Sequence, residues 1–236
     1  VRIGRDNDGG YLVSKSDIEK SDVLIGLGIN DDWSFERDFK KITNVEVFAY
    51  DASISQKFFI KQFIKSLARI DNPKLALNRI KTILSYRHFF STSNNHHIQK
   101  FVGLETDDKI HCTLEKILDD VMYNNIFLKI DIEGSEYRFL ETLMSYQKRI
   151  SGLVIEFHDC DLHLEAIAIF IKKFKLNLVH VHANEGAPIR ATDGLPLVLE
   201  LTFSKYCKSF QEPSLPHKFD MPNGKRNAEI QLVIDS

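Results

Sequence analysis

The stretch Phe127-Leu128-Lys129-Ile130-Asp131-Ile132-Glu133-Gly134-Ser135-Glu136-Tyr137 decides the fold of this 236-residue chain. An apolar run ends in the carboxylate Asp131, and a second carboxylate, a glycine and a helical pattern of apolar residues follow it. An α/β sheet delivers an acid in this way to the carboxyl edge of a strand, where such folds bind ligands. On an extended strand, Asp131 and Glu133 would point to the same face. Because Asp and Glu are rarely buried unless they are paired or bound to something, the stretch predicts a functional site.

The rest of the chain alternates between strand-like and helical patterns. Continuous apolar runs predict strands, amphipathic stretches predict helices, and an Asn-Asp-Gly-Gly turn predicts a hairpin over residues 1–13. The expected strands are 22–28, 45–50, 88–90, 101–103, 127–131, 153–158, 178–182, 197–203 and 229–234. One expected helix starts at 35 and is capped by Ser34, and another starts at 114 and is capped by Thr113. Further helices are expected over 55–84, with a break at Pro73, over 137–144 and over 162–174. This alternation is typical of βαβ units in a mainly parallel sheet.

Length and composition are those of one globular domain. With 43% hydrophobic and 27% charged residues, the chain can bury a sizeable core. We expect a single domain over 1–236, with an N-terminal hairpin segment at 1–21, a helical insertion or lid at 55–86 and a C-terminal extension at 205–236. Because the sequence starts at Val1 inside what reads as a structured segment, a trimmed start fits the pattern, and whether the native chain extends beyond Val1 stays open.

The charge pattern bears on the partners. The formal net charge is −2, and nucleic-acid binding is not expected because phosphate backbones need an obvious basic face. The one basic region runs from Lys57 to Lys81 and is interleaved with phenylalanines and isoleucines. Two interpretations stay open for it: an amphipathic helix with a solvated face, or a docking surface for an anionic substrate or a membrane.

The three cysteines, Cys112, Cys160 and Cys207, are widely spaced and include no C-x-x-C pair, so neither a zinc ribbon nor a disulfide framework is expected. An odd set of free thiols suits a reducing cytoplasm, which is the predicted location. We expect no signal peptide, and no apolar run approaches the ~18 residues that a membrane span needs. The sequence allows a homo-oligomer without requiring one.

A glycine turn and an acid suggest a cofactor site. Gly26 and Gly28 follow a buried strand and let the backbone pass close to a ligand, although tight packing alone would also explain them. Asp51 ends the next strand, where a Rossmann-like fold places the acid that binds ribose hydroxyls; a helix N-cap is its alternative role. The dinucleotide fingerprint is not met, because Asp31 stands where it has its third glycine. A negative side chain there disfavours pyrophosphate and favours a nucleoside cofactor without phosphates.

Together these motifs resemble the FkbM-type S-adenosylmethionine-dependent methyltransferases. The resemblance covers most of residues 1–204, and its most specific element is K-I-D-I-E-G-x-E. It is carried by Asp8-Gly9-Gly10-Tyr11, Gly26-Leu27-Gly28, Trp33-Ser34-Phe35-Glu36, Asp51, Lys129 to Glu136, and Ile155-Glu156-Phe157-His158. The chain departs from the wider methyltransferase pattern in lacking a third glycine after Gly28 and in its long insertion at 55–86.

The resemblance implies a fold, a reaction and a set of site residues. The fold is an α/β class I methyltransferase sheet of seven mostly parallel strands, with the last strand reversed and helices on both faces. The reaction is methylation of a sugar hydroxyl, on a nucleotide sugar or a polysaccharide precursor, in surface glycan or capsule biosynthesis. Gly26 and Gly28 would line the methionine end of S-adenosylmethionine, Asp51 its ribose, and Asp131 the edge between the cofactor and the substrate.

Histidines and acids at the ends of later strands complete the candidate site. Glu156 and His158 share a face of one strand, and His182 ends the next, so we expect all three to converge beside Asp131. These four residues, with Glu200 further off, are candidate catalytic residues that activate a hydroxyl. Asp131, His158 and His182 are also candidate ligands for Mg²⁺ or Mn²⁺. The alternative is that the histidines are hydrogen-bonded core residues and the acids cap turns.

Other functions fit the same pattern less well. An N-methyltransferase acting on an amine, a lipid or a peptide would need less base assistance, and a non-catalytic cofactor-fold module would need no convergent cluster. A metal-dependent glycosyltransferase typically carries a D-x-D motif, which Asp159-Cys160-Asp161 matches only in letters. The acceptor pocket is expected from 55–86 and the 184–196 loop, which carries Asn184, Glu185, Arg190 and Asp193.

Overall fold

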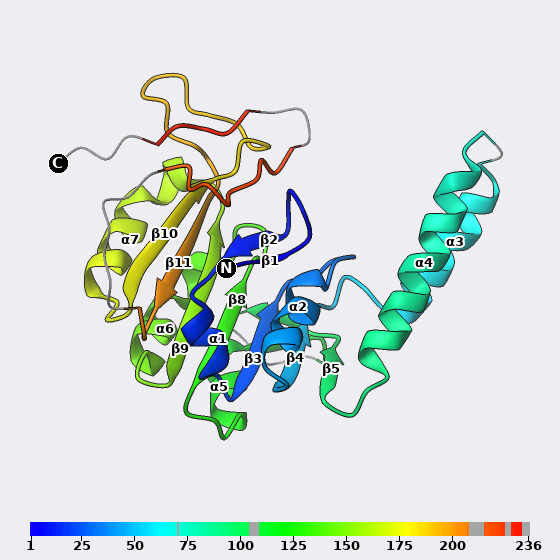
Figure 1. The fold of residues 1–236 in the computed structure, drawn as a ribbon, viewed down its shortest axis with the longest axis horizontal. Helices are drawn as coiled ribbons and strands as arrows, with labels where there is room; N and C mark the ends of the chain where they lie inside the picture. Colours follow the sequence, from blue (N-terminus) through cyan, green and yellow to red (C-terminus); the bar gives the residue numbers. More distant parts are fainter. Residues whose placement is uncertain (70, 104–108, 208–214, 225–227, 233–236) are drawn as a thin grey trace.

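A seven-stranded sheet forms the centre of the molecule (Figure 1). The computed structural model describes residues 1–69, 71–103, 109–207, 215–224 and 228–232. In spatial order the sheet consists of β5 (Asn95–Ile98), β4 (Glu46–Tyr50), β3 (Val23–Leu27), β8 (Ile126–Ile130), β9 (Ile150–Phe157), β11 (Leu199–Ser204) and β10 (Asn177–Ala183). Both pairings made by β11 are antiparallel, whereas the other strand pairs in this sheet are parallel. The expected mostly parallel sheet with a reversed last strand is therefore confirmed.

Both faces of the sheet are covered, which explains why the central strands are continuously apolar. Every residue of β3 and β8 is buried. One face packs against α5 (Leu114–Asp120), α6 (Leu140–Tyr146) and α7 (Cys160–Lys173). The other packs against α1 (Lys15–Glu19), α2 (Ser34–Ile42) and the N-terminal hairpin of β1 (Arg2–Gly4) and β2 (Gly10–Leu12).

Smaller elements complete the fold. A short parallel pair, β6 (Phe101–Gly103) and β7 (His111–Thr113), precedes α5, and the side chain of Thr113 caps α5 as expected. The 3₁₀ helix η1 (Glu136–Phe139) follows the turn after β8 and leads into α6. No helix among the described residues is long and apolar enough to cross a membrane.

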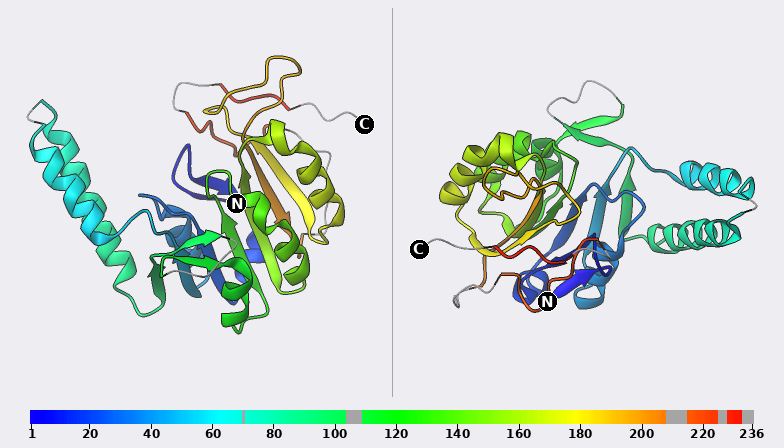
Figure 2. Two further views of the ribbon diagram at one scale, coloured as in Figure 1. Left: turned by 180° about the vertical axis from the view of Figure 1, so that it is seen from behind. Right: turned by 90° about the horizontal axis from the view of Figure 1, so that it is seen from above.

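A helical hairpin, α3 (Gln56–Leu67) and α4 (Pro73–Phe90), projects from the sheet edge next to β5 (Figures 1 and 2). Its base packs on Trp33 and Ile29 through Phe59, Tyr86 and Phe89. These aromatic residues extend α4 to Phe90, so the strand predicted at 88–90 is wrong. The strand begins instead at Asn95 and contains His96 and His97.

Two further details differ from expectation. Ser34 lies inside α2 rather than capping it; Asp32 accepts hydrogen bonds from the backbone N–H and the hydroxyl of Ser34. Residues 229–232 form no strand, and the last two residues of that expected element, 233–234, lie outside the described residues. The described parts of the C-terminal segment instead cross the carboxyl edge of the sheet beside the N-terminal hairpin (Figure 1). There Asp8 and Asn7 bond to the backbone carbonyls of Asn223 and Pro222.

Candidate active site

Neighbouring strands place polar side chains in one row at the carboxyl edge. His182 of β10 pairs with Glu200 of β11, which pairs with Glu156 of β9. Ile155 and Ile130 are also partners, so Glu156 lies beside Asp131, the residue after β8. Cross-strand partners share a face, and the row therefore results from the order and the register of these strands. The sequence showed each acid at a strand end, and the strand order brings them together.

A cavity of about 630 Å³ opens along this edge. The glycine loop after β3 and the end of β4 form one end, and the acids after β8 and in β9 form the other. The N-terminal hairpin, the loop after β10 and the C-terminal segment cover it. Its lining residues include Arg5, Asp8, Gly9, Gly28, Ile29, Asn30, Asp31, Asp32, Tyr50, Asp51, Lys100, Phe101, Val102, Lys129, Asp131, Glu133, Glu156, His158, Asn184, Asn223 and Gly224.

Gly26, inside β3, and Gly28, in the loop that follows it, have different roles. Gly28 lines the cavity in a left-handed conformation, with φ of +77°, and an added Cβ would lie 1.8 Å from the carbonyl oxygen of Asp131. Only glycine fits at this close approach of two strand ends. Gly26 is buried and is not among the lining residues; it makes room for the carboxylate of Glu36, 2.8 Å from where its Cβ would lie. Gly26 therefore lies beneath the residues that line the cavity and does not line it.

Asp51 lines the cavity and also holds the glycine loop in shape. One carboxylate oxygen accepts hydrogen bonds from the backbone N–H groups of Ile29 and Asn30, at 3.1 and 2.8 Å. The other accepts from the backbone and hydroxyl of Ser53, at 2.8 and 2.5 Å. The first oxygen thus orders the glycine loop and the second orders the turn after β4, before any ligand arrives.

At the opposite end, Tyr11 joins two acids. Its hydroxyl is 2.9 Å from Glu156 and 3.2 Å from Asp131, and Asn184 donates to the second oxygen of Glu156 at 3.1 Å. Tyr11 is buried, and burial together with the charges of Asp131 and Glu156 raises its pKa well above the ordinary range. It therefore stays protonated and acts as a donor.

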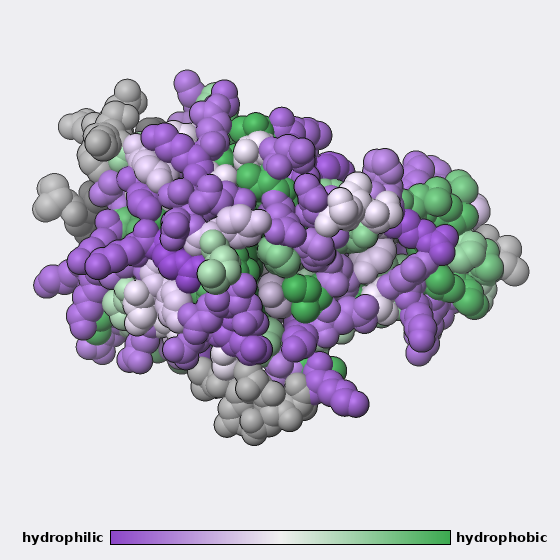
Figure 3. Space-filling model, turned by 90° about the horizontal axis from the view of Figure 1, so that it is seen from below, coloured by the Kyte–Doolittle hydropathy of each residue, from purple (hydrophilic) through white to green (hydrophobic). Residues whose placement is uncertain are grey.

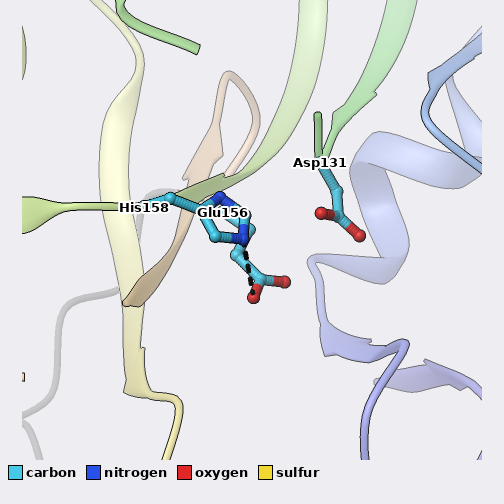
Figure 4. A group of neighbouring side chains, drawn as sticks. All are labelled: Asp131, Glu156 and His158. Carbon is cyan, nitrogen blue, oxygen red and sulfur yellow. Dashed lines mark ion pairs between the residues drawn. The ribbon is translucent and has the colours of Figure 1, made fainter. Parts of the chain in front are cut away.

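His158 faces the same acids (Figure 4). Its Nε2 lies 3.9 Å from Glu156 and 3.5 Å from Glu133. Its Nδ1 lies 3.1 Å from Glu136, which also accepts hydrogen bonds from the backbone N–H groups of Ile132 and Gly134. The same carboxylate oxygen of Glu136 therefore orders the turn after β8 and orients the imidazole of His158. Carboxylates accept and do not donate, so Nδ1–H donates and Nε2 is directed to the cavity.

The cluster shifts the titration of its members. Burial, and then the charges of Asp131 and Glu200, raise the pKa of Glu156 to about 8. Burial alone would lower the pKa of His158, but the hydrogen bond and charge of Glu136 and the charges of Glu156 and Asp131 raise it to about 9. For Glu136, burial opposes ionisation, yet the hydrogen bond with His158 brings its pKa below the ordinary value. The site thus holds a carboxyl and an imidazole that titrate near each other.

Lys129 supplies a buried positive charge beneath these acids. Its Nζ donates to the carbonyl oxygen of Gly28 at 2.8 Å and lies 3.6 Å from Asp131. Burial lowers its pKa, but the charges of Asp131, Glu36 and Glu156 outweigh that effect, so the ammonium is retained. Glu36 is fully buried on the far side, and burial raises its pKa to about 7 despite the charge of Lys129.

His182 does not join this cluster. Its two ring nitrogens lie 3.1 Å from Glu200 and 3.0 Å from Glu229. Burial lowers its pKa, but these two acids raise it to about 9. The expected convergence of His182 on Asp131 is wrong because β11 stands between β10 and β9 and its Glu200 takes the contact. A group with metal-ligand spacing contains Asp131, Glu156 and His158, and a second one contains His182 with Glu185 and Glu229.

Several site residues were not among the predicted ones. In the sequence, Tyr11 belongs to the Asp8-Gly9-Gly10-Tyr11 motif, and Lys129 and Glu136 are neighbours of Asp131 in the motif after the central strand. Their roles depend on side-chain directions that become known once the hairpin and η1 are placed over the sheet. The sequence signal for Glu136 was its position in K-I-D-I-E-G-S-E, where it follows the turn that it binds. Of the loop residues named as candidate contacts, Asn184 reaches the acids, whereas Arg190 pairs with Asp193 at an exposed site.

The strand order, the reversed β11 and the glycine loop at the carboxyl edge define a class I methyltransferase fold. No protein-family model matches the chain, and no curated protein matches its sequence. Among solved structures, it is similar to precorrin-6y C5,15-methyltransferase from Geobacter metallireducens GS-15, at 15% identity over 80% of this chain and 84% of that one, with a TM-score of 0.42.

Two other solved structures, an rRNA methylase and a methyltransferase-domain protein, are also similar to the chain. An rRNA methylase from Streptococcus thermophilus is 11% identical over 80% of this chain and 93% of its own, with a TM-score of 0.38. A human methyltransferase 10 domain containing protein is 10% identical over 82% of this chain and 78% of its own, with a TM-score of 0.41. We base the fold on the strand order and direction, and the function on the site.

Proposed function

We propose that this protein is an S-adenosylmethionine-dependent O-methyltransferase acting on a sugar hydroxyl. The observation that carries the proposal is one continuous cavity with a glycine loop and Asp51 at one end and Asp131, Glu156 and His158 at the other. Such a cavity suits a nucleoside cofactor and an acceptor that meet above the end of β8. Proximity and alignment of the two reactants supply much of the rate of an in-line methyl transfer.

The charge of the lining fits this cofactor. Seven acidic side chains and three from lysine or arginine line the described cavity. This excess of negative charge favours a cationic sulfonium and disfavours phosphates, and Asp31 and Asp32 follow the glycine loop where a pyrophosphate would lie. By the same argument, a polysaccharide precursor is a better acceptor than a nucleotide sugar. Gly28 and Asp51 would contact the cofactor, and Gly26 would act from beneath.

The acid cluster would handle the acceptor proton. When bound, S-adenosylmethionine supplies an activated methyl group; the carbon–sulfur bond breaks as the carbon–oxygen bond forms. A hydroxyl is a weak nucleophile until its proton is removed. We assign this proton to the carboxylates of Asp131 and Glu156, with Tyr11 holding both in place. His158, kept protonated by Glu136, balances the negative charge of these carboxylates until one of them takes up the proton.

A divalent cation is a second way to activate the hydroxyl. The oxygens of Asp131 and Glu156 and a ring nitrogen of His158 lie within 4.8 Å of one another, and this donor set suits Mn²⁺ better than Mg²⁺. The cation would, however, compete with the Tyr11 hydroxyl, which already bridges both acids, and with the ammonium of Lys129. We therefore favour proton transfer without a metal.

The sugar acceptor and the place within the FkbM-type family rest on the motifs around Asp131, Glu156 and His158. Their test is an assay of purified protein with S-adenosylmethionine and a panel of oligosaccharides and nucleotide sugars, with and without EDTA. We expect S-adenosylhomocysteine release on an oligosaccharide, unaffected by EDTA and reduced at least about 100-fold in Asp131→Asn. Failure to bind S-adenosylhomocysteine in calorimetry would refute the cofactor. Activity abolished by EDTA and restored by Mn²⁺ would replace the metal-free mechanism.

A further inference from the structure

The α3–α4 hairpin carries an apolar face that nothing else in the described structure covers. Its base is fixed to the domain by the aromatic cluster around Trp33, but the rest of the hairpin stands away from the sheet (Figures 1 and 2). Six of the exposed large hydrophobic residues lie on it, and four of them are 57 to 60% exposed: Ile64, Leu67, Leu77 and Leu84. Figure 3 shows apolar side chains gathered at the end of the hairpin remote from the domain.

The same face is strongly basic. Residues 56–90 contain eight lysines and arginines and a single acid, Asp71, although the whole chain has a net charge of −2. Arg69 and Arg79 pair with Asp71 and Asp31. The five lysines are exposed and, within the described residues, pair with no acid; they are Lys57, Lys61, Lys65, Lys74 and Lys81.

Helical spacing places the two kinds of side chain next to each other. On α3, Lys57, Lys61 and Lys65 recur every four residues, directly beside Ile60 and Ile64. On α4, Lys74 and Lys81 flank Leu77 and Leu84 in the same way. On both helices the exposed positions therefore bring lysines next to leucines or isoleucines. This is the composition of helices that lie in a membrane interface.

We infer that the α3–α4 hairpin docks the protein onto an anionic lipid surface. Such a surface offers acyl chains to the leucines and isoleucines and phosphate headgroups to the lysines. A second copy of the hairpin would cover the apolar side chains but would bring two sets of lysines together. A nucleic acid would satisfy the lysines and leave the apolar side chains in water. Of these three occupants, only a lipid surface satisfies both the lysines and the apolar side chains.

The direction in which the hairpin projects relates lipid docking to the cavity. The chain leaves β4 at Tyr50 and Asp51, the edge of the sheet where the cavity opens, and enters α3 a few residues later. In Figure 1 the far end of the hairpin lies on the same side as the loops over the cavity. A membrane in contact with the far end of the hairpin would thus lie on the side of the loops that cover the cavity. Lipid docking goes beyond the proposed reaction, and it holds whether or not the acceptor is a sugar.

Vesicle co-sedimentation with the full chain tests the inference. We expect binding to vesicles of phosphatidylcholine and phosphatidylglycerol, weakening with salt, and no binding to phosphatidylcholine alone. The double variant Ile64→Glu/Leu84→Glu changes only exposed side chains and should weaken binding at least about tenfold. Lys61→Glu/Lys65→Glu should do the same. The matched control is Leu162→Glu on α7, 74% exposed and far along the chain from the hairpin, which should bind like the parent protein.

Three results would overturn the inference. One is equal vesicle binding by the parent and both hairpin variants, with thermal unfolding confirming that all are folded. Another is a dimer in sedimentation velocity that Ile64→Glu/Leu84→Glu dissociates, in a protein that ignores vesicles. The last is salt-sensitive binding of a single-stranded RNA oligonucleotide without vesicle binding. None of these measurements depends on methyl transfer, so the proposed function stands or falls separately.

Discussion

At the scale of single residues, Gly28 has the most constrained place in the site. Its φ of +77° and the 1.8 Å between a built Cβ and the Asp131 carbonyl oxygen leave no room for a side chain. Gly28→Ala should therefore displace the glycine loop, weaken S-adenosylhomocysteine binding at least about tenfold and destabilise the fold by about 1–3 kcal/mol. Gly194→Ala is the control, because φ is +75° there but no atom lies within 4 Å of the added Cβ. If Gly28→Ala and Gly194→Ala had equal effects in calorimetry and thermal unfolding, the contact between position 28 and the Asp131 carbonyl would not be what requires glycine there.

Glu156 and His158 predict a narrow optimum in the pH dependence of activity. A carboxyl with a pKa of about 8 must lose its proton before it can accept one from the substrate, so kcat/KM should rise up to about pH 8. The imidazolium with a pKa of about 9 should then lose its charge and lower the rate. Because the two groups interact, the pKa values read from the rising and falling limbs of the pH profile belong to the pair and not to either residue alone. His158→Asn should remove the falling limb, and Glu156→Gln the rising one; an unchanged profile in both would exclude these residues.

At the scale of elements, the sequence predicted the sheet far better than the site. Apolar runs such as Val23 to Leu27 report burial on both faces, and that pattern depends on the local sequence alone. The row from His182 to Asp131 depends on strand order, and one intervening strand moved His182 onto Glu200. Phe89 and Phe90 suggested a strand because aromatic residues favour strands, but packing on Trp33 keeps them in α4.

The base of the hairpin is connected to the glycine loop through His97. Burial lowers the pKa of His97, so the ring is neutral; its Nε2–H donates to the Asp51 carbonyl at 2.9 Å, and Nδ1 accepts from Tyr86. Tyr86→Phe keeps the ring packing and should cost about 0.5–1.5 kcal/mol and raise the KM for S-adenosylmethionine. Tyr146→Phe, which loses an exposed bond to Asp119, is the control and should leave KM unchanged. If Tyr86→Phe keeps the parent KM for S-adenosylmethionine, His97 has a structural role only and does not influence cofactor binding.

At the scale of the whole molecule, charge is divided between two regions. The lining of the cavity is mainly acidic, whereas the projecting hairpin is basic. The total of −2 hides this division, which is why composition alone excluded polyanion binding in general but could not locate a lipid surface. The lysines and isoleucines interleaved between Lys57 and Lys81 did indicate a docking surface. Because α3 and α4 project away from the sheet, their apolar side chains are not buried in the domain, and this favours docking over a face that is simply solvated.

Raised pKa values at the acid row predict that alkaline pH destabilises the fold. His158 and His182 titrate at about 9 in the folded protein against about 6.5 when unfolded, so their contribution is complete below pH 6.5 and is lost as pH rises through 9. Glu156, raised to about 8, also binds its proton more tightly in the folded state. Calorimetry at constant ionic strength should give a Tm several degrees lower at pH 9 than at pH 6.5.

His182→Gln should flatten this pH dependence without touching the cavity, because His182 contacts Glu200 and Glu229 rather than Asp131. His88→Gln, at an exposed position on α4, is the matched control and should keep the parent slope. A Tm that rises or stays constant between pH 6.5 and 9 would mean that the acids of the row are not ionised around these histidines. The charge balance assigned to His158 in methyl transfer would then have to be abandoned as well, since it depends on the same pairing of imidazolium and carboxylate.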